Sequence, residues 1–136
     1  MILDTSVLLA ILFGEADANK WLKGISEHRI EGLYMSVANY LEAVLRVDSF
    51  KDPSLVANLD ELIAILNIQL EPVSNNQTKI AREANLLFGK NALSKAKLNF
   101  GDLFAYALAK ELRKPLLYKG NDFSHTEILS YRFDLV

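Results

Sequence analysis

Residues 1–15, MILDTSVLLAILFGE, decide the fold class. Residues 2–3 predict the end of a short buried strand, Asp4 interrupts the apolar run, and residues 7–13 predict a helix that Gly14 ends. The run lacks the basic region of a signal peptide, and it is too short to cross a membrane. A buried strand that leads directly into a helix is the first half of an α/β unit.

The rest of the chain continues this alternation of short apolar runs with helical patterns. Further strands are expected at residues 32–36, 68–73 and 115–118 and in the tail at 131–136, and further helices at residues 15–27, 37–49, 53–66, 76–88 and 102–112. Asp52-Pro53 is a helix-start signal, and Gly89 is expected just beyond a helix end. The pattern predicts an α/β sandwich with a parallel sheet.

One helix carries an explicit prediction about its buried face. In residues 37–49, the spacing of Leu41, Val44 and Leu45 predicts that these three side chains face the core. No internal repeat or linker-like segment interrupts the sequence. Residues 1–136 are therefore expected to form a single domain.

Composition restricts the chemistry that a site in this chain can use. The sequence has 136 residues, of which 51% are hydrophobic and 24% charged, so it can bury a core without disulfides. It contains no cysteine and only two histidines, His28 and His125, which excludes thiolate metal sites and disfavours a His-rich one. Any metal is therefore expected to be Mg²⁺ or Mn²⁺ held by oxygen. We expect a soluble, cytoplasmic protein with no membrane contact.

Carboxylates stand near the ends of several predicted elements. Asp4 and Asp122 follow predicted strands, Asp102 begins a predicted helix, and Glu42 lies in the helix after the second strand. In parallel sheets, ligands bind beyond the carboxyl ends of the strands. Asp4, Asp102 and Asp122 are therefore expected at one edge of the sheet. Glu42 joins them only if its helix turns one face toward that edge.

Each carboxylate also has a structural interpretation. Asp102 is favoured at a helix start by the helix dipole, Glu42 is spaced to pair with Arg46, and Asp122 is a common turn residue. Asp4 is different, because burying a carboxylate at an apolar strand end is costly unless it is paired or bound to metal. Asp4 therefore carries the strongest physical indication of a functional site.

A cluster of carboxylates suits metal-dependent hydrolysis. Hard divalent cations prefer oxygen ligands, and a bound cation lowers the pKa of a water molecule and neutralises charge on a phosphate. The hydroxyls of Thr5 and Ser6 are positioned to orient Asp4 or a water molecule. The net charge of −2 argues against a broad nucleic-acid-binding surface, but it is compatible with a nuclease whose acids bind metal.

These residues fall in segments that resemble the PIN-domain ribonucleases, and within them the VapC-type toxins of bacterial toxin–antitoxin pairs. The matching segments are residues 1–6 (MILDTS) with 8–12 and Gly14-Glu15, residues 39–43 (NYLEA), residues 98–109 (LNFGDLFAYALA) and residues 117–123 (LYKGNDF). Their order and spacing extend over nearly the whole chain. The segment around Asp102 is the most specific.

The resemblance implies a PIN-like three-layer sandwich, with a central, mainly parallel sheet of four to five strands flanked by helices. It implies that Asp4, Glu42, Asp102 and Asp122 are the catalytic and metal-binding acids, with Mg²⁺ or Mn²⁺ as cofactor. It further implies an RNA substrate, inhibition by a small antitoxin protein and a homodimer.

Other functions are compatible with the same residues. The chain could be a PIN-domain nuclease that processes RNA or cleaves DNA, or a binding domain of the same fold without catalysis. A phospho-acceptor signalling domain is disfavoured, because that class needs an acidic pair after the first strand and an acceptor Asp at a central strand end. Here Asp4 stands alone, and residues 68–73 end without an Asp.

Overall fold

The structure, a computed structural model, describes residues 1–130. The strands are β1 (Ile2–Leu3), β2 (Leu33–Ser36), β3 (Ile68–Glu71) and β4 (Leu116–Leu117). The α-helices are α1 (Thr5–Leu12), α2 (Ala18–Glu27), α3 (Val37–Asp48), α4 (Pro53–Ile65), α5 (Asn75–Phe88) and α6 (Phe100–Leu112). The strand expected at residues 131–136 lies outside the described residues.

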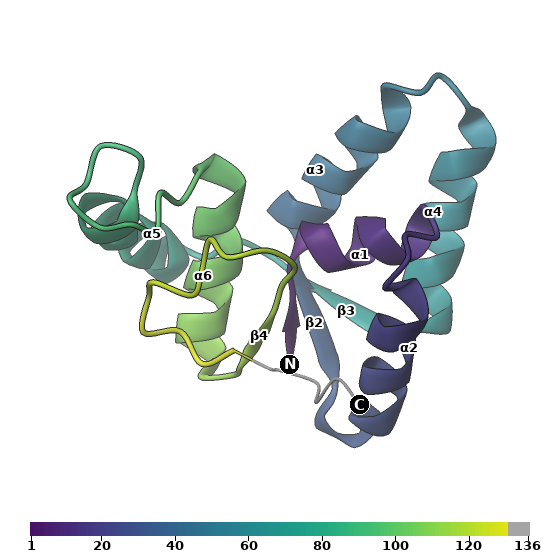
Figure 1. The fold of residues 1–136 in the computed structure, drawn as a ribbon, viewed down its shortest axis with the longest axis horizontal. Coiled ribbons are helices and arrows are strands. Elements are labelled where there is room, and N and C mark those ends of the chain that lie inside the picture. Colours follow the sequence, from purple (N-terminus) through teal and green to yellow (C-terminus); the bar gives the residue numbers. More distant parts are fainter. Residues whose placement is uncertain (131–136) are drawn as a thin grey trace.

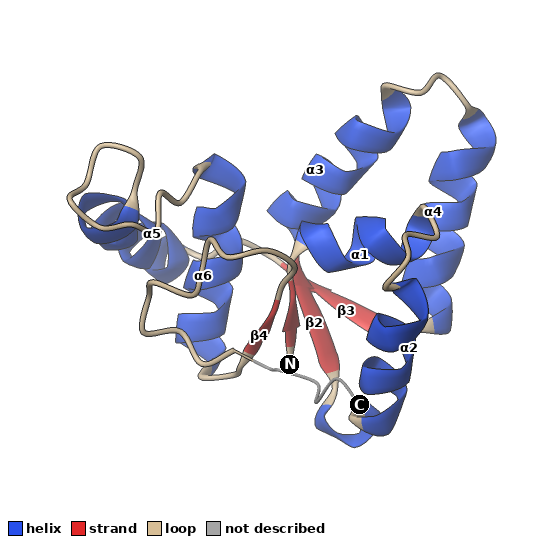
Figure 2. Cartoon of the chain, in the orientation of Figure 1, coloured by secondary structure: helices blue, strands red, loops and turns tan. Residues whose placement is uncertain are grey.

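The sheet is parallel throughout the described residues, with the strand order β3-β2-β1-β4 (Figure 2). Ile2 is in register with Tyr34 on one side and with Leu116 on the other, so β1 is a central strand. A parallel bridge between Leu116 and Ser130 extends pairing beyond β4. Because all strands run the same way, their carboxyl ends meet at one edge.

Successive residues of each strand point to opposite faces of the sheet, and this creates two hydrophobic cores. Leu3 and Met35 belong to the core under α1, α2, α3 and α4, whereas Ile2 and Leu116 belong to the core under α5 and α6. Figure 1 shows these two groups of helices on either side of the sheet. The predicted three-layer α/β sandwich is confirmed.

Two helices, α1 and α6, begin two residues earlier than the sequence predicts, and side-chain caps explain both differences. α1 begins at Thr5 because the Asp4 carboxylate accepts a hydrogen bond from the Ser6 amide. α6 begins at Phe100 because Asn99 caps it. Apolar periodicity gave no sign of these first turns. Other bounds differ by one to three residues, as expected at frayed element ends.

The predicted inward face of α3 is wrong for two of its three residues, since only Val44 packs against the core. Leu41 and Leu45 are 55% and 61% exposed, whereas Asn39, Ala43 and Val47 are buried. The helix is rotated so that its small and polar side chains face the interior. Glu42 follows Asn39 by three residues, so both lie on neighbouring parts of the same helix surface. This rotation carries the acid toward the carboxyl edge of the sheet.

Two further observations complete the fold. The predicted helix start at Asp52-Pro53 is confirmed, since Asp52 caps α4 and Pro53 begins it. Gly89 ends α5, but in an extended conformation rather than the left-handed one expected of such a glycine. Within residues 1–130, every helix falls short of the length or apolarity needed to cross a membrane.

Candidate active site at the carboxyl edge of the sheet

Asp4 lies where β1 ends and α1 begins. Its backbone amide donates to the Leu117 carbonyl of β4 at 3.0 Å, which fixes it at the carboxyl edge. Its side chain is only 6% exposed. The Oδ2 oxygen accepts hydrogen bonds from the Ser6 amide at 3.1 Å and from the Ser6 hydroxyl at 2.6 Å. The prediction that Ser6 orients Asp4 agrees with this geometry.

The Ser6 hydroxyl also connects Asp4 to the loop after β4. Ser6 Oγ accepts a hydrogen bond at 3.0 Å from the backbone amide of Lys119. The Lys119 ammonium points elsewhere, to salt bridges with Glu15 and with Asp17, the latter at 3.1 Å. The Lys119 side chain is therefore paired with neighbouring acids.

Thr5 has a different role from Ser6. Its hydroxyl donates to the Asn39 carbonyl at 3.1 Å, a buried contact between the start of α1 and the start of α3. The hydroxyl therefore fixes helix position and is not directed at the Asp4 carboxylate. Of the two predicted supporting residues, Ser6 contacts the acid and Thr5 holds the framework around it.

Asp102 is the third residue of α6 and forms a reciprocal capping box with Asn99. The Asn99 amide donates to Asp102 Oδ2 at 2.9 Å, and the Asp102 amide donates to Asn99 Oδ1 at 2.9 Å. The structural interpretation of this acid is thus correct. It does not exclude a functional one, because the cap uses Oδ2 and leaves Oδ1 without a protein partner among the described residues.

Glu42 approaches Asp102 by packing against Gly101. A Cβ atom at Gly101 would overlap the Glu42 carboxylate, so the close approach requires glycine. Next to this contact, the fully buried Asn39 donates from Nδ2 to the Gly101 carbonyl at 2.9 Å. No salt bridge joins Glu42 to Arg46 within residues 1–130, so the alternative role for Glu42 is wrong.

Asn39 and Gly101 are the two residues that sequence reasoning missed. Both lie inside the family segments, but they carry no charge and so gave no chemical signal. Their function depends on how α3 packs against α6, which is a contact between distant parts of the chain. The available clue was the glycine immediately before Asp102.

Asp122 lies in the loop after β4 and is exposed. Its charge is close enough to raise the pKa of Asp102, which places it on the same side of the sheet. Within residues 1–130, no three of the acidic and histidine side chains are arranged closely enough to bind a metal ion between them. The exposed Glu42 and Asp122 side chains would have to turn inward to complete such a site.

The charged forms of the two buried acids, Asp4 and Asp102, are destabilised by their surroundings. Burial raises the pKa of Asp4, against the hydrogen bonds from Ser6, and the nearby charge of Glu42 adds to the increase. Burial raises the pKa of Asp102 to about 7; the Asn99 amide opposes this, and Asp4, Asp122 and Glu42 add to it. Ionisation of these acids is therefore unfavourable in the protein alone, and a bound divalent cation would offset the negative charge.

This electrostatic situation predicts how stability changes with pH. An unfolded Asp titrates near about 3.9, and Asp102 in the fold titrates at about 7. Between these values the folded state binds more protons, so the free energy of unfolding falls as pH rises through that window. Thermal melting in chelator, from about pH 5 to about pH 8, should give a falling melting temperature.

The matched comparison for this prediction is Asp102→Asn, which keeps the capping oxygen but cannot ionise. We expect a shallower fall of melting temperature with pH in this variant, whereas the exposed Asp48→Asn leaves the slope unchanged. A melting temperature that rises over the same interval in the unmodified chain would contradict the assignment of raised pKa values.

The fold and the site together define a class: three-layer α/β proteins with an acidic site at the carboxyl edge of a parallel sheet. The PIN domain model matches residues 1–129 of this chain. Ribonuclease VapC28 of Mycobacterium tuberculosis is 44% identical over 128 residues, which is 94% of this chain and 95% of the relative. The chain therefore belongs to the PIN-domain family and, within it, to the VapC ribonucleases.

Solved structures agree with the fold. VapC20 of M. tuberculosis, described as a sarcin-ricin loop cleaving toxin, superposes with a TM-score of 0.73 at 16% identity and covers 96% of this chain and 98% of its own. A chain of a toxin–antitoxin complex from Klebsiella pneumoniae gives a TM-score of 0.69 at 15% identity and covers 98% of each chain. At these identities, the likeness concerns the fold alone.

Proposed function

We propose that this chain is a metal-dependent endoribonuclease that acts as the toxin of a toxin–antitoxin pair. The observation that carries the proposal is the 44% identity to a VapC ribonuclease over nearly the full length of both chains. The convergence of Asp4, Glu42 and Asp102 on one edge of the sheet supports it independently.

The acids fit a hard divalent cation such as Mg²⁺ or Mn²⁺. All the candidate ligands are carboxylate oxygens, and two of them are buried with raised pKa values, as expected of a site built to surround positive charge. Asp4 and Asp102 would hold the ion, with Glu42 and Asp122 completing its surroundings. When bound, the ion would activate water for attack on the RNA phosphodiester and neutralise charge on the phosphate.

The residues of the chain then have separable roles. Ser6 holds the Asp4 carboxylate in one orientation, and the capping box holds Asp102. Asn39 keeps the backbone of Gly101 in place, so that Glu42 can lie against it. Catalysis of this kind depends on preorganised charges, so these hydrogen bonds contribute by limiting movement of the acids.

Protein partners also belong to the proposal. The likeness to a chain from a toxin–antitoxin complex supports a small antitoxin as inhibitor. Family resemblance supports a homodimer and a cytoplasmic location. The exposed Leu41 and Leu45 on α3, which lie one turn apart, offer apolar surface for a partner protein.

One experiment tests the nuclease proposal. The purified chain is incubated with single-stranded RNA and with DNA of the same sequence, in Mg²⁺, in Mn²⁺ and in EDTA. We expect cleavage of RNA with either metal, no cleavage in EDTA and intact DNA. Cleavage in EDTA would exclude the metal, DNA cleavage would favour the alternative nuclease, and RNA binding without cleavage would favour a binding domain.

A further inference from the structure

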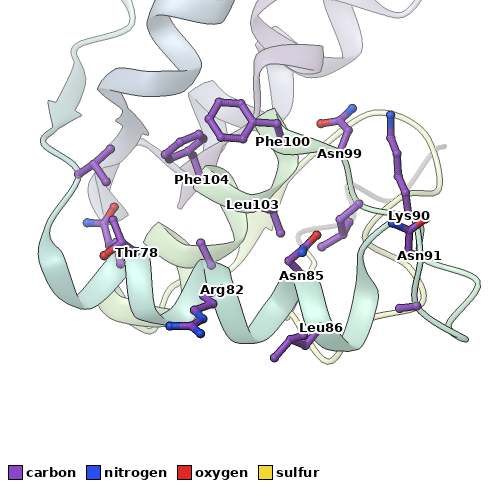
Figure 3. Close-up of a pocket in the computed structure, with 15 residues that line it drawn as sticks. Thr78, Arg82, Asn85, Leu86, Lys90, Asn91, Asn99, Phe100, Leu103 and Phe104 are labelled. Carbon is purple, nitrogen blue, oxygen red and sulfur yellow. The ribbon is translucent and has the colours of Figure 1, made fainter.

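A groove runs between α5 and the beginning of α6, and Asn99, the residue that caps α6, is part of its lining. Its volume is about 850 Å³. Figure 3 shows α5 along one side, with Arg82, and α6 along the other, with Phe100 and Phe104. Lys90 follows α5 at one end of the groove. None of the acids of the candidate active site lines it.

The groove is a basic concave surface on an acidic protein. Arg82 and Lys90 are the charged residues among the described ones that line it, and both are positive. Within residues 1–130 neither takes part in a salt bridge, so their charges are uncompensated. Since the chain carries a net charge of −2, this local surface is complementary to a polyanion.

An aromatic pair stands in the same groove. Phe100 is 78% exposed, and its ring packs edge to face against Phe104, with centroids 4.9 Å apart and an interplanar angle of 89°. This contact packs the Phe100 ring against Phe104, while most of the Phe100 surface remains exposed. Exposed aromatic rings beside cations are how proteins bind single-stranded nucleic acid, since bases stack on the ring while cations bind phosphates.

Consecutive residues at the start of α6 contribute to the groove and to the acidic site. Phe100 lies between Asn99, which caps α6, and Gly101, which packs against Glu42. Asp102 follows directly. The groove and the acidic site therefore border the same first turn of α6, although the side chains of Phe100 and Asp102, two residues apart, do not face each other.

We propose that this groove binds the single-stranded RNA next to the cleaved phosphodiester, with a base stacked on Phe100 and phosphates bound by Arg82 and Lys90. The inference rests on the proposed ribonuclease function and assigns a substrate subsite to it. A second copy of the chain is the alternative occupant, and the oligomeric state distinguishes it in the test below.

Binding is measured by fluorescence anisotropy with labelled RNA of about a dozen nucleotides. Every variant is made in the Asp4→Asn chain, so that the RNA stays intact. We expect Phe100→Ala to weaken binding by roughly 5- to 100-fold, the range for loss of one stacked base. We expect Arg82→Gln combined with Lys90→Gln to reduce the dependence of log affinity on log salt by about 1.4, or about 0.7 per phosphate.

Matched controls lie outside the groove. Phe50→Ala removes another exposed aromatic ring, and Lys23→Gln removes an exposed cation on α2. Both should bind RNA as the Asp4→Asn chain does. Unchanged RNA affinity in the Phe100 and Arg82/Lys90 variants, with RNA cleavage by the unmodified chain intact, would overturn the subsite alone.

Two other outcomes are distinguishable. If Phe100→Ala converts a dimer into a monomer by light scattering while RNA affinity is unchanged, the groove is a subunit contact and the proposal is wrong. If the unmodified chain neither binds nor cleaves RNA, the ribonuclease function fails and the subsite fails with it.

Discussion

Asp4→Asn is expected to reduce RNA cleavage by about three orders of magnitude, which corresponds to roughly 4 kcal/mol of lost transition-state stabilisation. The amide keeps an oxygen that can accept the Ser6 hydrogen bonds, but it removes the negative charge that a cation requires. The measurement is the initial rate of cleavage of a labelled RNA at matched metal concentration.

The same substitution should leave the fold intact and stabilise the metal-free protein. Burial raises the pKa of the Asp4 carboxyl, so its ionised form destabilises the folded state, and an amide cannot ionise. Melting in chelator should therefore give a higher melting temperature than for the unmodified chain. Full activity of Asp4→Asn would remove Asp4 from the proposed mechanism, and loss of folding would make its activity uninformative.

Gly101→Ala is expected to reduce cleavage about 100-fold, the size of effect that a displacement of about 1 Å at a catalytic centre produces. The new methyl group would occupy the space of the Glu42 carboxylate and force that side chain away. Glu42 is exposed and can turn into solvent, so the fold tolerates the change. Alanine also favours a helix over glycine, so the melting temperature should stay the same or rise.

A double-mutant cycle makes this prediction specific. In a Glu42→Ala background no carboxylate remains to be displaced, so Gly101→Ala should have no further effect on cleavage. Equal losses from Gly101→Ala with and without Glu42 would show that the glycine acts in another way, for example through the backbone of Asp102.

Local patterns in the sequence were sufficient to predict the fold class. Alternating apolar runs and helical patterns predicted the order of strands and helices, and the position of Asp4 after a buried strand predicted an acid at the carboxyl edge. Helix starts were less accurate, because α1 and α6 are begun by side-chain caps, whereas periodicity detects only the apolar residues that come later.

Contacts between distant segments were not predictable in the same way. Leu41 and Leu45 have the spacing of a buried stripe, yet the Thr5 and Gly101 contacts of Asn39 turn a different face of α3 inward. The approach of Glu42 to Gly101 depends on that same rotation. The local pattern alone suited Glu42 equally to the acidic site and to a pair with Arg46. Only the resemblance to a known family assigned it to the site.

The link between Ser6 and the loop after β4 runs through the main chain of Lys119, not through its side chain. Every amino acid except proline supplies the same amide hydrogen at that position. Substitutions of the side chain at position 119 therefore leave the hydrogen bond that orients Asp4 in place. Loss of the hydroxyl at position 6 removes it. Sequence variability at position 119 is therefore a poor guide to its structural importance.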